Sequence, residues 1–319
     1  MPCSRFAMAL TRWRTICWTN SLILRDGQRR LEMMPNEAFD KLFDKVPNDV
    51  SDKASDKASD EARYLYCIVN SPSCGQEHLG NIGIERQAVY TIPYKDIAAI
   101  VHTCQPVPYD SKDPRKAEGW VLEHSYVIDQ AMKKYESILP FSFDVILREG
   151  DSQIEQWLGR NYDRLWKQLD ALLGKAEYTV QIFYDYEFLK AKILMANLDL
   201  NDMQNRIENE SKGKAYLLSK KLNQIIKRDL EAESRLLAEE FLLQIKEHAD
   251  KLVVNDRPSW IPENFRDMKL MASYSCLVRK DNVDRLGEVL EGINSLQGFR
   301  VRFTGPWAPF SFVDFQGLA

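Results

Sequence analysis

The first half of the chain alternates short strand-like runs with two stretches of helical periodicity. Leu65, Cys67 and Val69 alternate with Tyr64, Tyr66 and Ile68, which predicts a strand whose two sets of side chains face opposite ways. Further β-rich runs lie at 87–92, 96–102, 138–147 and 178–184. Between them, apolar residues recur at three- and four-residue spacing over 120–135 and over 154–173, followed by Gly174. These stretches predict two helices, the second ended by a glycine C-cap.

The order strand, two strands, helix, strand, helix, strand is a variation on the ferredoxin-like α/β sandwich. We therefore assign residues 63–185 to a first domain of this kind. A long helical section follows, from Tyr186 to about residue 252, with a break at 209–213. Its apolar stripe comprises Leu218, Leu222, Ile226, Leu230, Leu237, Phe241 and Ile245. Such a stripe usually packs against another element, and the alternative is a surface that binds a partner's groove.

The last third of the chain predicts a compact strand–helix–strand unit. A turn-rich connector at 257–262 precedes a strand over 270–278, a helix over 283–296 and a strand over 299–303. We join this unit to the long helical section as a second domain, 186–319. The predicted fold class is thus α+β with two domains.

Residues 1–62 differ in composition from the rest. The unit Ser51-Asp-Lys-Ala returns at Ser55 and, as Ser-Asp-Glu-Ala, at Ser59, with no apolar residue larger than alanine. Such a repeat buries too little surface to offset chain entropy, so we predict a disordered extension and linker that folding does not need. Residues 1–34 carry six arginines against Asp26 and Glu32, and a basic anchoring arm is the alternative.

The C-terminal segment is aromatic and conformationally restricted. Gly305, Pro306, Trp307, Pro309, Phe310 and Phe312 are its candidate interaction or structural residues. Gly305 can adopt positive φ, and each proline fixes its own φ and restricts the preceding residue. Because no side chain here titrates near neutral pH, the segment is expected to hold a shape or a partner. We predict that it folds back against the strand–helix–strand unit of the second domain.

Four short motifs resemble those of one known family. Gly305-Pro-Trp-Ala-Pro-Phe-Ser-Phe312 is similar to the Gly-Pro-Trp-Pro-Pro-Tyr-Ser-Phe ending of the gas vesicle accessory proteins of the F/L family. Weaker similarities lie at Tyr64–Val69, Leu139–Asp144 and Gly213–Leu217. Four positions depart from the family pattern: Cys67, Ser142, Asp144 and Ala308 stand where the family has Gly, Arg, Gly and Pro.

The resemblance implies a non-enzymatic minor component or assembly factor of gas vesicles in the cytoplasm. Its expected partners are the hydrophobic gas vesicle shell protein and other gas vesicle accessory proteins, and its expected role is to assist nucleation or assembly. Sheet edges, an amphipathic helix and an aromatic tail suit such a partner, which exposes apolar surface before assembly. The alternative is a small-ligand-binding or enzymatic protein on a ferredoxin-like scaffold.

Composition excludes several other classes of function. A net charge of −4 argues against a general nucleic-acid binder, and no apolar run reaches the ~20 residues of a membrane span. Six cysteines without CxxC spacing predict free thiols, with no metal. No phosphate-binding glycine loop is present, so we expect no cofactor, and Gly80-Asn-Ile-Gly83 is interpreted as a turn.

His124 is the strongest catalytic candidate, with Glu123 beside it and Asp129 five residues later. Adjacent helical residues point apart, so Glu123 cannot orient His124. His124 lies on the apolar stripe of its helix, which favours a buried structural histidine. Tyr64, Tyr66 and Tyr184 suggest a base-stacking platform only weakly, because no basic cluster surrounds them. We therefore predict no catalytic residues.

Overall fold

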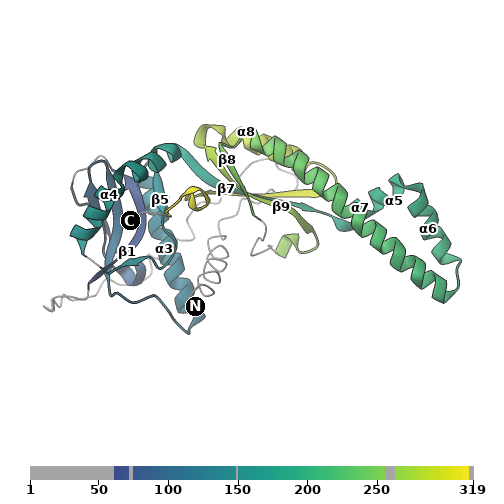
Figure 1. Cartoon of the computed structure of the whole chain (residues 1–319), viewed down its shortest axis with the longest axis horizontal. Helices are drawn as coiled ribbons and strands as arrows, with labels where there is room; N and C mark the ends of the chain where they lie inside the picture. Colours follow the sequence, from purple (N-terminus) through teal and green to yellow (C-terminus); the bar gives the residue numbers. More distant parts are fainter. Residues whose placement is uncertain (1–60, 72–74, 149, 256–262, 316–319) are drawn as a thin grey trace. The chain divides into compact units, whose positions relative to one another are not determined.

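The structure, a computed structural model, describes residues 61–71, 75–148, 150–255 and 263–315 (Figure 1). Residues 1–60 of the predicted extension lie outside the described residues, and so does the whole connector at 257–262. Contacts within the chain form two compact units, one of 61–178 with 305–315 and one of 179–304. The predicted second domain included the C-terminal segment, whereas these contacts assign it to the first unit.

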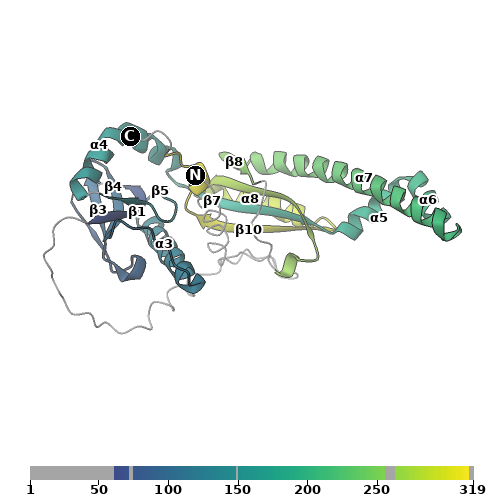
Figure 2. The same cartoon turned by 60° about the horizontal axis from the view of Figure 1, so that its bottom comes forward.

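The first unit is an antiparallel sheet with two long helices. Its strands are β1 (Ala62–Asn70), β2 (His78–Gly80), β3 (Val89–Tyr94), β4 (Ile97–Cys104), β5 (Ile138–Pro140) and β6 (Ile146–Leu147). The sheet order is β2-β3-β4-β1-β5, and β6 also pairs with β1. Helices α3 (Pro114–Lys134) and α4 (Asp151–Leu172) lie on opposite faces of this sheet (Figure 2). Strand β7 (Lys175–Tyr184) then leads into the second unit.

A β-bulge in β1 overturns the predicted alternation of its side chains. Leu65 pairs with Val101, but Cys67 pairs with Ile100, so Tyr66 is the extra residue. Because a bulge shifts the alternation by one residue, Tyr64 and Tyr66 share one core cluster with Cys67 and Val69. This cluster lies under α3 and also contains Trp120, Val127, Ile128 and Ala131.

The run 138–147, predicted as one strand, forms two short strands. Both β5 and β6 pair with β1, and a turn lies between them at residues 143–144. Asp144 has a φ of 71°, which a continuous strand cannot contain. Its backbone N–H donates to the Tyr64 hydroxyl at 2.9 Å, so the loop is fixed to the core by a tyrosine.

The second unit has the element order expected of a ferredoxin-like domain, which we had predicted for the first. It contains β7, helices α5 (Tyr186–Ala196), α6 (Leu198–Glu208) and α7 (Lys212–Lys246), then β8 (Lys251–Val254), β9 (Lys269–Arg279), α8 (Val283–Asn294) and β10 (Phe299–Trp307). Its sheet order is β10-β7-β9-β8. This is β-α-β-β-α-β with extra helices in the first crossover. The first unit, where four strands precede its first long helix, does not have that order.

The apolar stripe of α7 is core, as favoured from the sequence. Leu222 and Ile226 are buried against Leu200 of α6, and Figure 1 shows α5 and α6 beside the N-terminal half of α7. Farther along, Leu230 packs with Tyr184 and Leu189. The Tyr274 hydroxyl of β9 donates to the Ala238 carbonyl of α7, which places the C-terminal half of α7 against the sheet.

The predicted helix to residue 252 is too long, because α7 ends at Lys246 and residues 251–254 form β8. Val253 and Val254 are β-branched and favour a strand. Strand β8 pairs antiparallel with β9, Lys251 opposite Leu277 and Val254 opposite Tyr274. The hydrophobic periodicity of α7 carries into this segment, and only its β-branched residues signal the change.

Candidate interaction site

The C-terminal segment is fastened to the first unit, not to the strand–helix–strand unit as predicted. Ala308 is 3% exposed and belongs to the core cluster under α3, and Phe310 packs against the same cluster. Phe315 stacks on Phe141 with ring centroids 4.2 Å apart. The physical reason is that β10 runs on past the second unit, so the residues that follow it meet apolar surface of the first.

Hydrogen bonds complete this attachment. Glu177 is 6% exposed, and its carboxylate accepts from the Ser311 N–H at 2.9 Å and from the Ser311 hydroxyl at 2.7 Å. On α4, Arg164 donates to the Asp314 carboxylate at 2.9 Å. Gln168 of the same helix accepts from the Asp314 N–H and donates to its carbonyl. A buried carboxylate that receives two donors fixes the segment in one position.

The six predicted residues of the segment divide into different environments. Gly305 has a φ of 138°, and a Cβ there would lie 2.7 Å from Tyr178 Cδ1, so both conformation and space require glycine. Pro309 is buried, Phe310 and Phe312 are half-buried, and Pro306 is exposed. Trp307 is also half-buried. Gly305, Pro309 and Phe310 are thus part of the packing of the first unit.

His124 is a fully buried structural residue, as its position on the helix favoured. Its Nδ1 lies 2.9 Å from the Tyr64 hydroxyl, and its ring stacks on Tyr66. Tyr66 in turn lies 2.8 Å from His102 Nδ1, and His102 Nε2 lies 3.1 Å from the Tyr109 hydroxyl. We call these five residues, Tyr64, Tyr66, His102, Tyr109 and His124, the buried polar network.

Burial sets the protonation of this network. It lowers the pKa of His102 to about 4 and that of His124 to about 3, so both imidazoles are neutral near pH 7. It also raises the pKa of Tyr64 and Tyr66 well above 10. Since Tyr64 and Tyr66 are fully buried, they cannot form the stacking platform considered from the sequence.

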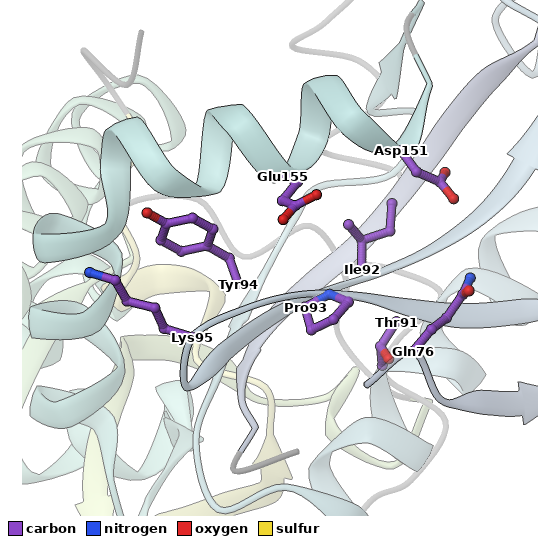
Figure 3. A pocket seen from close by; sticks show the side chains of 8 residues that line it. All are labelled: Gln76, Thr91, Ile92, Pro93, Tyr94, Lys95, Asp151 and Glu155. Atoms are coloured by element: carbon purple, nitrogen blue, oxygen red, sulfur yellow. The ribbon is translucent and has the colours of Figure 1, made fainter. Parts of the chain in front are cut away.

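A shallow hollow of about 410 Å³ lies between α4 and β3 (Figure 3). Its charged residues are Lys95, Asp151 and Glu155. The Asp151 carboxylate is already engaged, because it accepts from Arg63 Nε at 2.6 Å and from the Tyr90 hydroxyl at 3.0 Å. Asp151 therefore secures the start of α4 to the sheet.

A larger groove of about 550 Å³ lies at the other end of α4. We call it the α4 groove. Its lining includes Asn70, Asp96, Lys134, Glu136, Ser137, Trp166, Leu169, Asp170 and Leu173. Trp166 is 43% exposed and Leu173 is 45% exposed. Neither His124 nor Asp129 lines either hollow, and no group of three metal-ligating side chains occurs among the described residues.

Sequence reasoning missed the α4 groove. The stripe that marked the α4 helix gave Leu165, Leu169 and Leu172, all buried, whereas Trp166 lies beside that stripe. The available signal was that the apolar arc of α4, with Trp166 included, is wider than a stripe that only faces the core. Its other wall comes from the end of α3 and the residues after it, and no sequence spacing reveals that proximity.

Comparisons with known proteins now bear on this arrangement. Residues 62–314 match the family described as "Gas vesicle synthesis protein GvpL/GvpF". The chain belongs to this family. It is 30% identical over 257 residues to gas vesicle protein L1 of Halobacterium salinarum, covering 78% of this chain and 89% of that protein. It is 25% identical to gas vesicle protein L of Haloferax mediterranei, covering 81% and 89% of the respective chains.

A solved structure shares the fold. The crystal structure of the gas vesicle protein GvpF from Anabaena superposes with a TM-score of 0.63 at 20% identity, and covers 80% of this chain and 98% of that one. Membership of the gas vesicle family confirms the resemblance drawn from the C-terminal motif. None of the helices in the described part of the chain is long and apolar enough to cross a membrane.

Proposed function

We propose that the chain is a non-enzymatic minor component or assembly factor of gas vesicles, which binds the hydrophobic shell protein and assists nucleation or assembly. The observation that carries this proposal is the family match over residues 62–314. It extends from the first described strand almost to the end of the described residues, and so includes both units and the fastened C-terminal segment.

The chemistry of the described surface supports a binding role. The histidines of the buried polar network are shielded from solvent, and the two hollows hold carboxylates and lysines without a nucleophile paired to a base. Exposed apolar side chains instead lie at several places, among them Trp166 and Leu173 in the first unit and Leu236 and Leu243 on α7. Apolar surface of this kind suits a hydrophobic protein partner. Other gas vesicle accessory proteins are further proposed partners.

The test combines capture with vesicle formation. A tagged full-length chain, co-expressed with the shell protein, should retain it on an affinity matrix. Cells that carry the remaining gas vesicle genes but lack this chain should form fewer vesicles, with recovery on complementation. Absence of capture together with unchanged vesicle numbers would contradict the proposal.

The C-terminal segment should be tested by point substitution. Deletion would remove Ala308 and Phe310 from the first-unit core, so loss of binding after deletion would report misfolding. Ser311→Ala removes the hydroxyl donor to Glu177 and keeps the N–H donor. We expect a loss of about 1 kcal/mol in the free energy of unfolding, measured by urea titration, with capture of the shell protein unchanged.

A further inference from the structure

The α4 groove combines concave shape, exposed apolar surface and unpaired negative charge in the first unit. Three large apolar side chains are exposed in the described part of that unit, Val107, Trp166 and Leu173. Two of the three border this groove. They lie seven residues apart along the chain, about two helical turns, with buried Leu169 between them.

The walls of the groove are fixed by hydrogen bonds. Asp96 accepts from Trp166 Nε1 at 3.1 Å and from the Tyr162 hydroxyl at 2.5 Å, which holds the indole in place. At the base, the Ser137 hydroxyl donates to the Leu169 carbonyl at 2.5 Å, and the Ser137 N–H donates to Asn70. Because these hydrogen bonds join residues of the chain itself, the walls are already ordered and little ordering remains to oppose binding.

The charge at the rim is predominantly negative. Asp96, Glu136 and Asp170 stand against Lys134 alone, and Lys134 is already paired with Glu77. The carboxylates of Glu136 and Asp170 make no ion pair with any residue of the described part of the chain. A cationic group of a partner could therefore pair with the carboxylates of Glu136 and Asp170, which lie next to apolar surface.

The C-terminal end of α4 also favours a cationic partner group. Its last turn contains no basic residue, although the exposed carbonyls of a helix C-terminus favour a cation. Asp170 places a negative charge there instead, an arrangement that the helix dipole disfavours. A lysine or arginine from a partner would satisfy both the carboxylates and the helix end.

We propose that the α4 groove binds the gas vesicle shell protein, through a segment that inserts an apolar side chain between Trp166 and Leu173 and places a basic residue against Asp170 and Glu136. This inference rests on the proposed function and assigns its surface. The apolar contact supplies most of the affinity, because desolvated anchors dominate interfaces. The charges supply orientation and a dependence on salt.

The experiment measures capture of the co-expressed shell protein by the full-length chain and by matched variants. Asp170→Lys is paired with Asp163→Lys, which makes the same charge change on the same helix outside the groove. Leu173→Ser is paired with Leu296→Ser, a leucine that follows α8 and is 47% exposed. Melting temperatures of all four should lie close to that of the parent chain, so lost capture cannot come from unfolding.

We expect the two groove variants to bind at least about tenfold more weakly and the two controls to bind like the parent chain. Overlapping peptides of the shell protein, titrated against the full chain, should bind only where an apolar residue lies next to lysine or arginine. That binding should weaken as salt rises.

Capture by the parent chain with equal capture by the groove variants would overturn the groove while leaving the proposed function intact. Peptide binding confined to acidic segments would overturn the charge argument, and with it the proposal. Failure of the parent chain to capture the shell protein would overturn both.

Discussion

The buried polar network and the α4 groove lie in the same unit and use their polar groups in opposite ways. In the network, each histidine meets a tyrosine hydroxyl within 2.9 Å, and both histidines are fully buried. In the groove, two carboxylates have no ion pair among the described residues, and an indole and a leucine are exposed. The network holds the residue types associated with catalysis, yet only the groove is open to a partner.

This difference shows that residue type alone does not locate function. Histidine and tyrosine can specify a core when they are hydrogen-bonded to one another inside it. Carboxylates and apolar side chains suggest a site when they remain uncompensated at a concave surface. If the network contributes stability alone and the groove is dispensable for folding, substitutions in the network should lower the free energy of unfolding and those in the groove should not.

The largest expected effect is that of His124→Ala. The substitution removes a ring packed on Tyr64 and Tyr66 and deprives the Tyr64 hydroxyl of one partner. We expect the free energy of unfolding to fall by about 3 kcal/mol, as for other buried ring truncations. Urea unfolding measures it, with His78→Ala as the control, because His78 is exposed and its loss should change little. Equal effects of the two substitutions would contradict a structural role for the network.

Counted per pH unit, the pH dependence of stability should come next in size. The folded-state pKa values of His102 and His124 are about 4 and about 3, below their ordinary value of 6.5. The unfolded chain therefore binds more protons below pH 6.5, and stability should fall as pH drops from 6.5 towards 4. Each histidine contributes a slope of about 1.4 kcal/mol per pH unit over that range.

Asp129 opposes this slope and provides its control. Burial raises the pKa of Asp129 to about 6 from 3.8, so Asp129 favours the folded state as pH falls between those values. Asp129→Asn removes that contribution and should make the loss of stability between pH 6 and pH 4 steeper. Urea titrations at stepped pH values would show it, and a shallower slope in the variant would mean that the assignment is wrong.

Much of the fold follows from sequence, and the exceptions have local causes. Strands β1, β3, β4, β7 and β9 and helices α3, α4 and α8 were predicted within a few residues, because each has a clear period. The bulge at Tyr66 and the short strand β8 were missed. Both depend on pairing with a distant strand, which no local period records.

The placement of the C-terminal segment could not be predicted for a related reason. The aromatic residues of the segment predicted that it packs against the protein, and Ala308, which lies between them in the sequence, is buried. Composition does not say which unit supplies the surface that the segment packs against. The deciding contacts come from Glu177 and α4, more than 130 residues earlier in the chain. The groove likewise needs residues from both α4 and the end of α3. Long-range proximity is the information that a single sequence lacks.

Trp307→Ala should have a smaller effect than His124→Ala. Truncation of a core tryptophan costs about 3–5 kcal/mol, but Trp307 is half-buried and its neighbour Pro306 is exposed. A loss of about 1–2 kcal/mol is expected, since the exposed part of the side chain stays in water either way. Phe310→Ala, which removes a ring packed against the first-unit core, is the comparison and should cost more. A larger loss for Trp307 would show that its ring carries more of the attachment than its burial indicates.

The smallest expected effect is that of Asp170→Lys. It tests the difference between the groove and the network most directly, because this substitution should stabilise the chain whereas the others should destabilise it. Asp170 lies in the last turn of α4, where a negative charge faces unsatisfied carbonyls. Asp170→Lys should therefore raise the free energy of unfolding by about 0.3–1 kcal/mol at low salt. Asp163→Lys, near the middle of the same helix, lacks this benefit and serves as the control. Paired urea titrations, repeated in high salt to screen the charges, would measure the difference. If Asp170→Lys instead destabilises the chain, the carboxylate contributes to folding, and the groove is then no different in kind from the buried polar network.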